Sequence, residues 1–279
     1  MAAWPNIPLE DTFGDCMRKA LRGNGIDALE LARHTGIDPL DIEAWLEDRS
    51  TASGSQARDA ARVLRLDPEK FAERAAGAWH PPAIHVDDVR RHAQLPHPSN
   101  GYVFFIEGEQ HAALVDPAGD PSHLLRILRD GKYHLQYILI THKHADHCDA
   151  AAEVAAAFPN AQIVMHELDV RAIGTLAEEA HLVRDGDELP FGESARIRML
   201  HTPGHTDGSV CYLYDSTIFT GDTLFSDSVG GCFGNDFGYA DILNSIRSKI
   251  FTLPEETVIM PGHGPPTTVA LEKAHNPFF

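Results

Sequence analysis

The sequence predicts a chain in two parts, a small all-α domain over residues 1–80 and a larger α/β domain over residues 81–279. Up to residue 80, apolar residues recur at helical spacing, with capping residues and helix breakers between the segments. After Trp79 the pair Pro81-Pro82 interrupts the chain, and short apolar runs typical of strands then alternate with helical segments. A chain of 279 residues is long enough for one large and one small hydrophobic core.

Five helices are expected in the N-terminal part. Asp38-Pro39 and Asp67-Pro68 each place an N-cap carboxylate before a proline, which is well tolerated at the first position of a helix. Glycine at positions 23, 25 and 36 indicates where helices end. The expected helices cover residues 10–22, 27–34, 38–48, 56–65 and 68–76.

Strands and helices alternate in the second part, which predicts mixed sheets. The run over residues 137–141 is short and apolar, as in a strand that is buried on both faces. The stretch from Pro81 to Pro98 has the composition of a linker that leads into the domain. The other expected strands are 102–107, 112–116, 162–166, 195–200, 210–214, 217–220 and 257–260, and the expected helices are 121–129, 150–157 and 241–251.

The charge of the chain argues against nucleic acids and membranes as partners. The net charge is −18, and both parts are acidic: residues 1–80 hold 10 Lys and Arg against 14 Asp and Glu, and residues 81–279 hold 13 against 27. Neither part offers the positive field on which non-specific binding to nucleic acid or to anionic lipid depends. A small-molecule substrate, including an anionic one, remains compatible with this charge, because bound cations act locally.

The cellular location is expected to be the cytoplasm. No apolar run approaches the length of a membrane span, and the first residues lack the basic start and apolar run of a secretory signal. The four cysteines are scattered without paired spacing, as is typical of reduced thiols; they are Cys16, Cys148, Cys211 and Cys232.

A histidine-rich run predicts metal binding. The segment Thr141 to His147 reads THKHADH and directly follows the apolar run expected to form a buried strand. In an extended loop, positions i and i+2 point the same way, so His142 and His144 can bind one ion. Asp146 and His147 follow as the chain turns into the next helix, and they can bind a second ion. Imidazole and carboxylate ligands suit zinc, iron or manganese.

Three further candidate ligands follow apolar strands, each beside a glycine that lets the backbone turn sharply. They are His205 in TPGHT, Asp222 in FTGD and His263 in MPGHGP. A single Gly-His or Gly-Asp pair is usually a plain turn, and the histidine-rich run alone is compatible with a surface cluster. All four elements together, each at a strand end, predict one metal site.

With these motifs the chain resembles the metallo-β-lactamase superfamily over about residues 83–279, through THKHADH, TPGHTDGS, FTGDTLF and PGHGPPTT. The resemblance implies a four-layer αββα sandwich with metals at one edge of the sheets, and its nearest branch is that of the glyoxalase II-like hydrolases, especially the short forms. It also implies two divalent metal ions, with zinc expected first and iron or manganese as alternatives. The first metal would be bound by His142, His144 and His205, the second by Asp146, His147 and His263, and Asp222 would bridge both. As the catalytic residue, Asp146 would orient a metal-bound hydroxide.

The chain departs from that branch at the expected substrate site. Full-length glyoxalase II enzymes carry a C-terminal helical domain with basic residues for glutathione, whereas only 16 residues follow His263 here. The segment after GDTLF reads VGGCFG over residues 229–234 and has no arginine. The glycine-rich stretch 230–238 is either a loop that closes over a substrate or a plain surface connection. Lys143 and Cys232 are the candidate substrate-binding residues, with a solvated lysine and an inert thiol as the alternatives.

Three functions follow from these features. The first is a metal-dependent hydrolase of thioesters, esters or lactones, with thioesters first because of the glyoxalase II-like resemblance. The second is a persulfide dioxygenase-like oxidoreductase, which would use one iron bound by His142, His205 and Asp222. The third is a regulator in which the metal domain senses a ligand and the helical part binds DNA.

The helical part resembles a helix-turn-helix domain of the phage-repressor type over about residues 12–75. Residues 32–37 correspond to the end of its first helix and the turn, and residues 40–48 to the recognition helix. That helix carries acids where readers of bases usually place Arg, Lys, Gln or Asn. We therefore expect the helical part to form a homodimer contact or a cap on the catalytic domain in preference to binding DNA.

Overall fold

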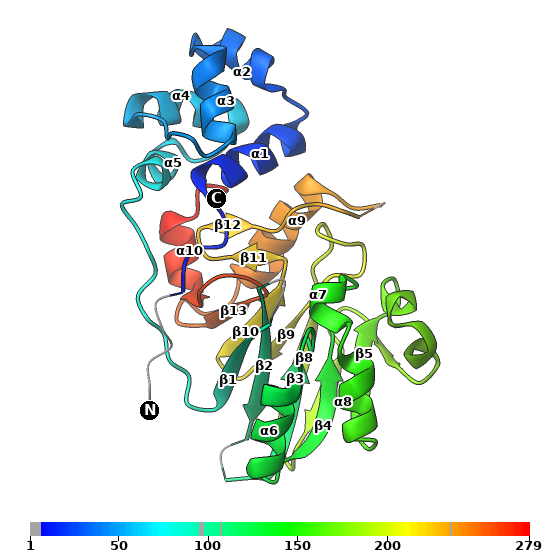
Figure 1. Ribbon diagram of the computed structural model, residues 1–279. Coiled ribbons are helices and arrows are strands. Elements are labelled where there is room, and N and C mark those ends of the chain that lie inside the picture. Colours follow the sequence, from blue (N-terminus) through cyan, green and yellow to red (C-terminus); the bar gives the residue numbers. More distant parts are fainter. Residues whose placement is uncertain (1–6, 95–97, 107, 235) are drawn as a thin grey trace.

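The computed structural model describes residues 7–94, 98–106, 108–234 and 236–279, and it divides into a helical part and a layered α/β part (Figure 1). The helical part lies at one end of the layered part, next to the C-terminus of the chain. It contains α1 (Phe13–Asn24), α2 (Ala28–Thr35), α3 (Pro39–Leu46), α4 (Gly54–Leu64) and α5 (Pro68–Ala75).

The limits of these helices follow from their caps. Helix α1 was expected to begin at residue 10, but it begins at Phe13 because Thr12 and Asp15 form a capping box. It ends at Gly25, whose φ of 65° is readily adopted only by glycine. Asp38 and Asp67 accept hydrogen bonds from backbone N–H groups of α3 and α5, as the Asp-Pro pairs predict.

The layered part contains two six-stranded sheets. The first has the strand order β1-β2-β3-β4-β5-β6, with β1 (Val89–Gln94), β2 (Ser99–Phe105), β3 (His111–Val115), β4 (His134–Leu139), β5 (Gln162–His166) and β6 (His181–Val183). The second has the order β14-β13-β10-β9-β8-β7, with β7 (Glu188–Phe191), β8 (Ala195–His201), β9 (Val210–Tyr214), β10 (Thr217–Gly221), β13 (Val258–Pro261) and β14 (Thr267–Thr268). A short hairpin, β11 (Leu224–Phe225) and β12 (Ser228–Val229), follows β10.

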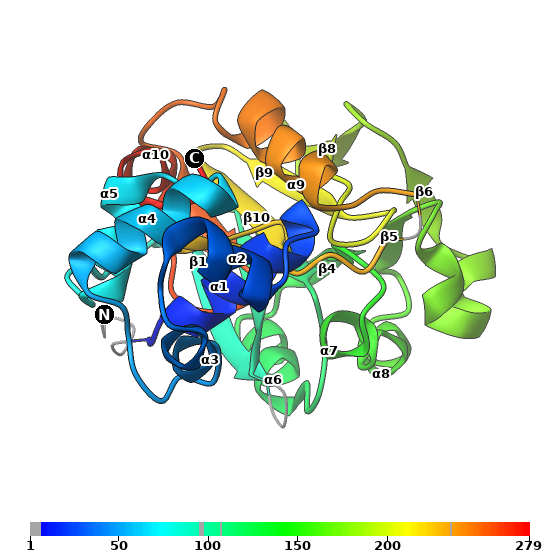
Figure 2. The same ribbon diagram turned by 90° about the horizontal axis from the view of Figure 1, so that it is seen from above.

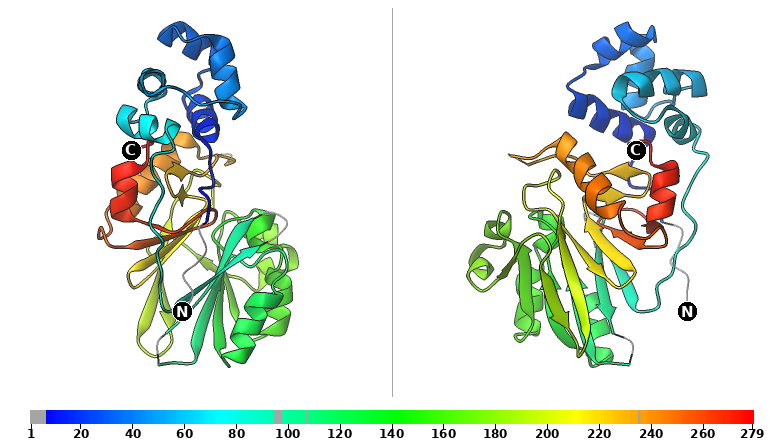
Figure 3. Two further views of the ribbon diagram at one scale, coloured as in Figure 1. Left: turned by 60° about the vertical axis from the view of Figure 1, so that its left-hand side comes forward. Right: turned by 180° about the vertical axis from the view of Figure 1, so that it is seen from behind.

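The sheets are packed face to face and covered by helices on both outer faces (Figure 3). Aromatic residues of both sheets, among them Phe104, Tyr212 and Phe219, fill the core between them. A second core lies between the first sheet and the helices α6 (Ser122–Asp130) and α8 (Ala151–Ala157). The second sheet is covered by α9 (Tyr239–Ser245), which continues as a π-helical turn (Ile246–Ile250), and by α10 (Val269–His275). The expected four-layer αββα architecture is confirmed.

The helical part shares a hydrophobic core with the end of the layered part. Phe13, Trp45 and Phe71 of the helices belong to the same buried cluster as Ile246 and Phe278. Seen from above, α1 lies across the end of the sandwich (Figure 2). The two parts therefore share one buried cluster, while the domain boundary near residue 80 stays a prediction.

Polar contacts also join the helical part to the layered part. The guanidinium of Arg74 forms a buried ion pair of 2.5 Å with Asp227, in the turn between β11 and β12. Lys70 donates to the carbonyl oxygens of Lys273 and Phe279, at 2.7 and 2.8 Å. These contacts support the expectation of a cap on the catalytic domain, whereas a homodimer contact stays a prediction.

The acids of the expected recognition helix lie at the surface. Asp38, Asp41 and Glu43 of α3 and its N-cap are exposed, and α2 and α3 form the end of the helical part farthest from the sheets (Figure 1). Among the helices that the structure describes, none is long and apolar enough to cross a membrane.

Several elements of the layered part were not expected. Residues 89–94 form strand β1 at the edge of the first sheet, although the stretch 81–98 has the composition of a linker. Charged side chains such as Arg90 and Arg91 are common on edge strands, and here they hide the strand pattern. Strands β6, β7 and β14 and helix α10 were also missed, because each is too short for its periodicity to be recognised. The expected strand end at residue 107 lies outside the described residues.

Candidate metal centre

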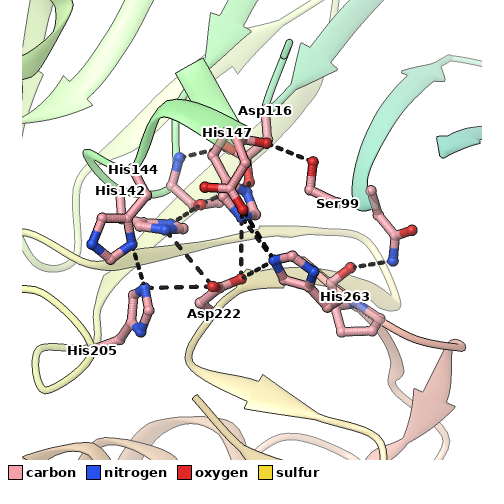
Figure 4. A network of polar contacts seen from close by, with 12 residues as sticks. Ser99, Asp116, His142, His144, His147, His205, Asp222 and His263 are labelled. Atoms are coloured by element: carbon pink, nitrogen blue, oxygen red, sulfur yellow. Dashed lines mark hydrogen bonds and ion pairs between the residues drawn. The ribbon is translucent and has the colours of Figure 1, made fainter. Parts of the chain in front are cut away.

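The seven predicted ligands converge at one edge of the two sheets, where loops from both meet (Figure 4). Five of these side chains come from strand ends or from the loop after β4. At two positions near them the backbone lies so close to neighbouring side chains that only glycine fits. Gly221 has a φ of 46°, and a Cβ at this position would lie 2.3 Å from the hydroxyl oxygen of Thr141. A Cβ at Gly262 would lie 2.3 Å from Oδ1 of Asp222. Both positions therefore require glycine for the loops to approach each other.

The ligand atoms fall into two groups. Within each group the ligand atoms lie within 4.8 Å of one another. The first group contains His142, His144, His205 and Asp222, and the second contains Asp146, His147 and His263.

Distances within the first group suit a small cation. Nε2 of His205 lies 2.8 Å from Nδ1 of His144 and 3.4 Å from Oδ2 of Asp222. Two ligand atoms bound to one tetrahedral zinc ion at 2.0–2.1 Å lie roughly 3.3 Å apart, which is close to these separations. Nε2 of His142 lies 3.9 Å from the same carboxylate oxygen. The donor atoms thus face one common point.

The second group faces the other oxygen of the same carboxylate. Oδ1 of Asp222 lies 3.3 Å from Nε2 of His147 and 3.6 Å from Nε2 of His263. Oδ2 of Asp146 lies 3.4 Å from Nε2 of His263. The two oxygens of Asp222 therefore face the two groups separately, as a bridging ligand would.

Two buried atoms in the centre make no hydrogen bond among the described residues. They are Nε2 of His142 and Oδ1 of Asp222. Buried polar atoms are almost always satisfied, and a bound ion is one of the few ordinary partners of those that no protein group satisfies. The donor set of imidazoles and carboxylates is also that of divalent transition metals. The residues present thus fit divalent metal ions, while the role of each residue as a ligand stays a prediction.

The second ring nitrogens of three of these histidines contact oxygen atoms outside the two ligand groups. Nδ1–H of His205 donates to the carbonyl of Gly231 at 2.6 Å, and Nδ1 of His263 lies 3.1 Å from the carbonyl of Pro98. Nδ1 of His147 lies 3.0 Å from Oδ2 of Asp116. Such outer partners fix the tautomer that leaves the other nitrogen free for a metal.

Asp116 connects two of the predicted ligands. It lies in the loop directly after β3, where it accepts from the backbone N–H and the hydroxyl of Thr141, at 2.8 and 2.7 Å. Because that hydroxyl donates to Asp116, its lone pairs are free to accept from Nδ1–H of His142, 3.0 Å away. One buried carboxylate thereby orients His142 through Thr141 and His147 directly.

Asp169 joins the two loops of the first group. This carboxylate is almost fully buried and accepts from the N–H of Lys143 at 3.1 Å and from the hydroxyl of Thr206 at 2.5 Å. It was missed from the sequence, as was Asp116, because each is a single aspartate outside any histidine motif. Their positions after strands, Asp116 directly after β3 and Asp169 at the end of the turn that follows β5, are the signal that could have identified them.

Burial and the neighbouring charges shift the pKa values of the ligands. Burial, with the neighbouring imidazoles, holds the pKa of His142 well below its usual value, and burial lowers the pKa of His205 to about 4. Burial opposes ionisation of Asp222, but the nearby His147, His263 and His205 outweigh it and hold the pKa of this carboxyl well below its usual value. Neutral His142 and His205 and an ionised Asp222 are the forms that bind metals.

The two candidate substrate residues lie in different surroundings. The ammonium of Lys143 lies 3.6 Å from Asp169, so this lysine is ion-paired and not simply solvated. Cys232 is partly buried, and burial raises the pKa of its thiol to about 11, so the thiol is protonated at neutral pH. Cys148 is buried, and His201 lies in β8, apart from both ligand groups.

Comparisons with known proteins agree with this architecture. Residues 97–263 match the metallo-beta-lactamase superfamily. Over 189 residues the chain is 29% identical to hydroxyacylglutathione hydrolase GloC of Haemophilus influenzae, covering 62% of this chain and 89% of that protein. The crystal structure of TTHA1623 in a di-iron-bound form is 29% identical with a TM-score of 0.59, and covers 68% of this chain and 100% of that one. ETHE1 from Myxococcus xanthus gives the same identity and TM-score, over 68% of this chain and 83% of that one.

The family match spans more than half of the chain and contains all seven converging side chains. The chain belongs to the metallo-beta-lactamase superfamily, as the motifs predicted.

Proposed function

We propose that the chain is a hydrolase with two divalent metal ions that cleaves a thioester, an ester or a lactone. The observation that carries the proposal is the arrangement of two ligand groups around one shared carboxylate, with each oxygen of Asp222 facing a different group. Two divalent cations bound there would lower the pKa of a shared water and polarise a substrate carbonyl.

The side chains of the centre divide into those that hold metals and those that meet the substrate. The buried imidazoles of His142, His147 and His205 are rigidly oriented ligands, because their second ring nitrogens are hydrogen-bonded. The side chain of Asp146 is 28% exposed, more than any of these. This exposure supports the predicted role of Asp146 in orienting a metal-bound hydroxide, while its carboxylate remains near His263.

Thioesters are the first substrate class to test. A thiolate departs readily as an anion, so of the three substrate classes a thioester depends least on a general acid. The similarity to a hydroxyacylglutathione hydrolase supports the same choice.

A mononuclear iron oxidoreductase is the second candidate. His142, His205 and Asp222 form a two-histidine, one-carboxylate set, and the similarity to ETHE1 adds to its support. The presence of a second complete group, Asp146, His147 and His263, favours the hydrolase.

The test is a screen of thioesters, esters and lactones with protein loaded with zinc, iron or manganese. Asp222→Asn removes the shared carboxylate, and Asp41→Asn makes the same change at an exposed position of α3. We expect at least one class to be hydrolysed and Asp222→Asn to lower the rate by roughly a hundredfold or more, beyond the usual effect of losing an outer partner. Full activity in Asp222→Asn would contradict the proposal.

A further inference from the structure

A cavity of about 380 Å³ lies between helix α1 and the segment that follows the β11–β12 hairpin. One wall is the polar face of α1, with Asp15, Arg18, Lys19 and Arg22. The opposite wall includes Cys232 and Phe233. The cavity therefore joins the helical part to the loop that lies against the candidate metal centre.

That loop connects the cavity to the metal ligands. The ring of Phe233 lies 5.6 Å from the imidazoles of both His144 and His205, and the guanidinium of Arg22 lies 5.6 Å from the same ring. The carbonyl of Gly231, another wall residue, accepts the hydrogen bond from Nδ1 of His205. Phe233 therefore contacts both the imidazoles of the metal centre and the guanidinium on α1.

A glycine in α1 allows this helix to pack closely against the catalytic part. Gly23 packs directly on the ring of Tyr239, and a Cβ at this position would lie only 2.2 Å from that ring. The side chain of Lys19 donates to the carbonyl of Val229 at 2.6 Å and is ion-paired with Asp11. These contacts hold one face of α1 against the catalytic part.

One cation of this face is not neutralised by an acid. Arg18 is paired with Asp15, and Lys19 with Asp11. Among the residues that the structure describes, no carboxylate oxygen lies within 4.0 Å of the guanidinium of Arg22, which is exposed. With Arg18 and Lys19 paired, the wall formed by α1 keeps one positive charge that is unpaired among the described residues, 5.6 Å from the ring of Phe233. The fork of N–H donors on arginine matches the geometry of a carboxylate or phosphate.

We propose that this cavity binds an anionic group of the substrate, a carboxylate or a phosphate, and that Arg22 is the cation that recognises it. The helical part then supplies a substrate-binding residue to the catalytic part, which its own loop over residues 229–234 lacks. The proposal rests on the hydrolase function and narrows its substrates to acyl compounds with an anionic group remote from the cleaved bond.

Two thioesters of equal length test the proposal, one with a terminal carboxylate and one with a neutral amide at the same position. Arg22→Gln is compared with wild type and with Arg33→Gln, which removes one exposed charge from α2. A lost charged hydrogen bond is typically worth a factor of about ten to a hundred, so Arg22→Gln should raise the KM of the carboxylate substrate by about that factor. Its kcat, and both constants of the neutral substrate, should change little. Equal effects on both substrates would overturn the proposal.

A second readout does not depend on catalysis. Cys232 lies in the same cavity, so its alkylation by anionic iodoacetate and neutral iodoacetamide reports the local preference for anions. Any change in thiol reactivity affects both reagents, and the ratio of the two rates isolates the charge effect. We expect Arg22→Gln to lower the iodoacetate-to-iodoacetamide ratio severalfold, with Arg33→Gln at the wild-type ratio. An unchanged ratio, or a Cys232 that neither reagent reaches, would refute the anion site even if thioesters are hydrolysed. A lowered ratio without thioester hydrolysis would instead refute the proposed function alone.

Discussion

Replacing Asp116 by asparagine tests how the outer shell orients the metal ligands. Oδ2 of Asp116 accepts from the hydroxyl of Thr141 at 2.7 Å and lies 3.0 Å from Nδ1 of His147, while Oδ1 accepts from the N–H of Thr141 at 2.8 Å. Asparagine keeps the size of the side chain and tolerates the local φ of 51°. It replaces one acceptor oxygen by an NH₂ group that can only donate.

Either orientation of the amide leaves a conflict. If the NH₂ group faces the backbone of Thr141, two donors meet, and the backbone N–H cannot turn away. If the NH₂ group faces His147, the imidazole loses its acceptor or moves its proton to Nε2, the atom that points at the second ligand group. Loss of such an outer partner costs roughly tenfold to a hundredfold in metal affinity, or about 1.4–2.8 kcal/mol.

The assay is a competition titration of zinc against a chromophoric chelator of known affinity. In Asp116→Asn we expect the more affected equivalent of metal to be bound roughly ten to a hundred times more weakly than in wild type. Asp120→Asn is the control, because Asp120 lies nearby on the surface and accepts from the N–H of Ser122, away from both ligand groups. Binding of both equivalents within twofold of wild type, in a variant that folds normally, would refute the account of Asp116.

Three further predictions concern stability. Burial raises the pKa of Glu272 to about 8, so the contribution of this group to the free energy of unfolding is complete below the usual value of 4.5 and is lost as the pH rises through about 8. The stability of Glu272→Gln in urea should therefore depend less on pH between pH 5 and 8 than that of wild type. An unchanged pH profile would contradict this. Arg74→Leu leaves Asp227 buried without its partner and should lower the free energy of unfolding by about 3–5 kcal/mol. The control, Arg62→Leu, breaks an exposed ion pair and should cost less than about 1 kcal/mol. Similar losses in the two variants would show that the buried pair is unimportant for stability. Removing metals with a chelator should lower the melting temperature, and zinc at about 1,000 times its Kd should restore roughly 4 kcal/mol of the free energy of unfolding. A melting temperature of wild type that does not depend on metal would argue against the centre. So would an Asp222→Asn variant that zinc stabilises as much as wild type.

The residues of the candidate centre could be predicted because each lies in a short motif at a strand end. The run from His142 to His147 contains four of them, and His205, Asp222 and His263 each follow a glycine after an apolar strand. Their convergence depends on the topology, since the loops come from both sheets, and the resemblance to a known family supplied that topology. Asp116 and Asp169 have no comparable pattern, so only the fold reveals that they hold the ligands.

The relation between the helical part and the centre could not be predicted. Gly23 meets Tyr239, and Arg74 meets Asp227, across contacts between residues far apart in the chain. No periodicity reports such contacts. The cavity beside Arg22 depends on them entirely, because it forms only where α1 meets the loop after the β11–β12 hairpin.

The metal content of protein purified without chelators tests the central claim most directly. Two ligand groups around the shared Asp222 predict close to two equivalents of zinc, iron or manganese per chain, falling sharply in Asp222→Asn. A single iron per chain that is unaffected by His263→Ala would contradict the dinuclear hydrolase and favour the mononuclear oxidoreductase.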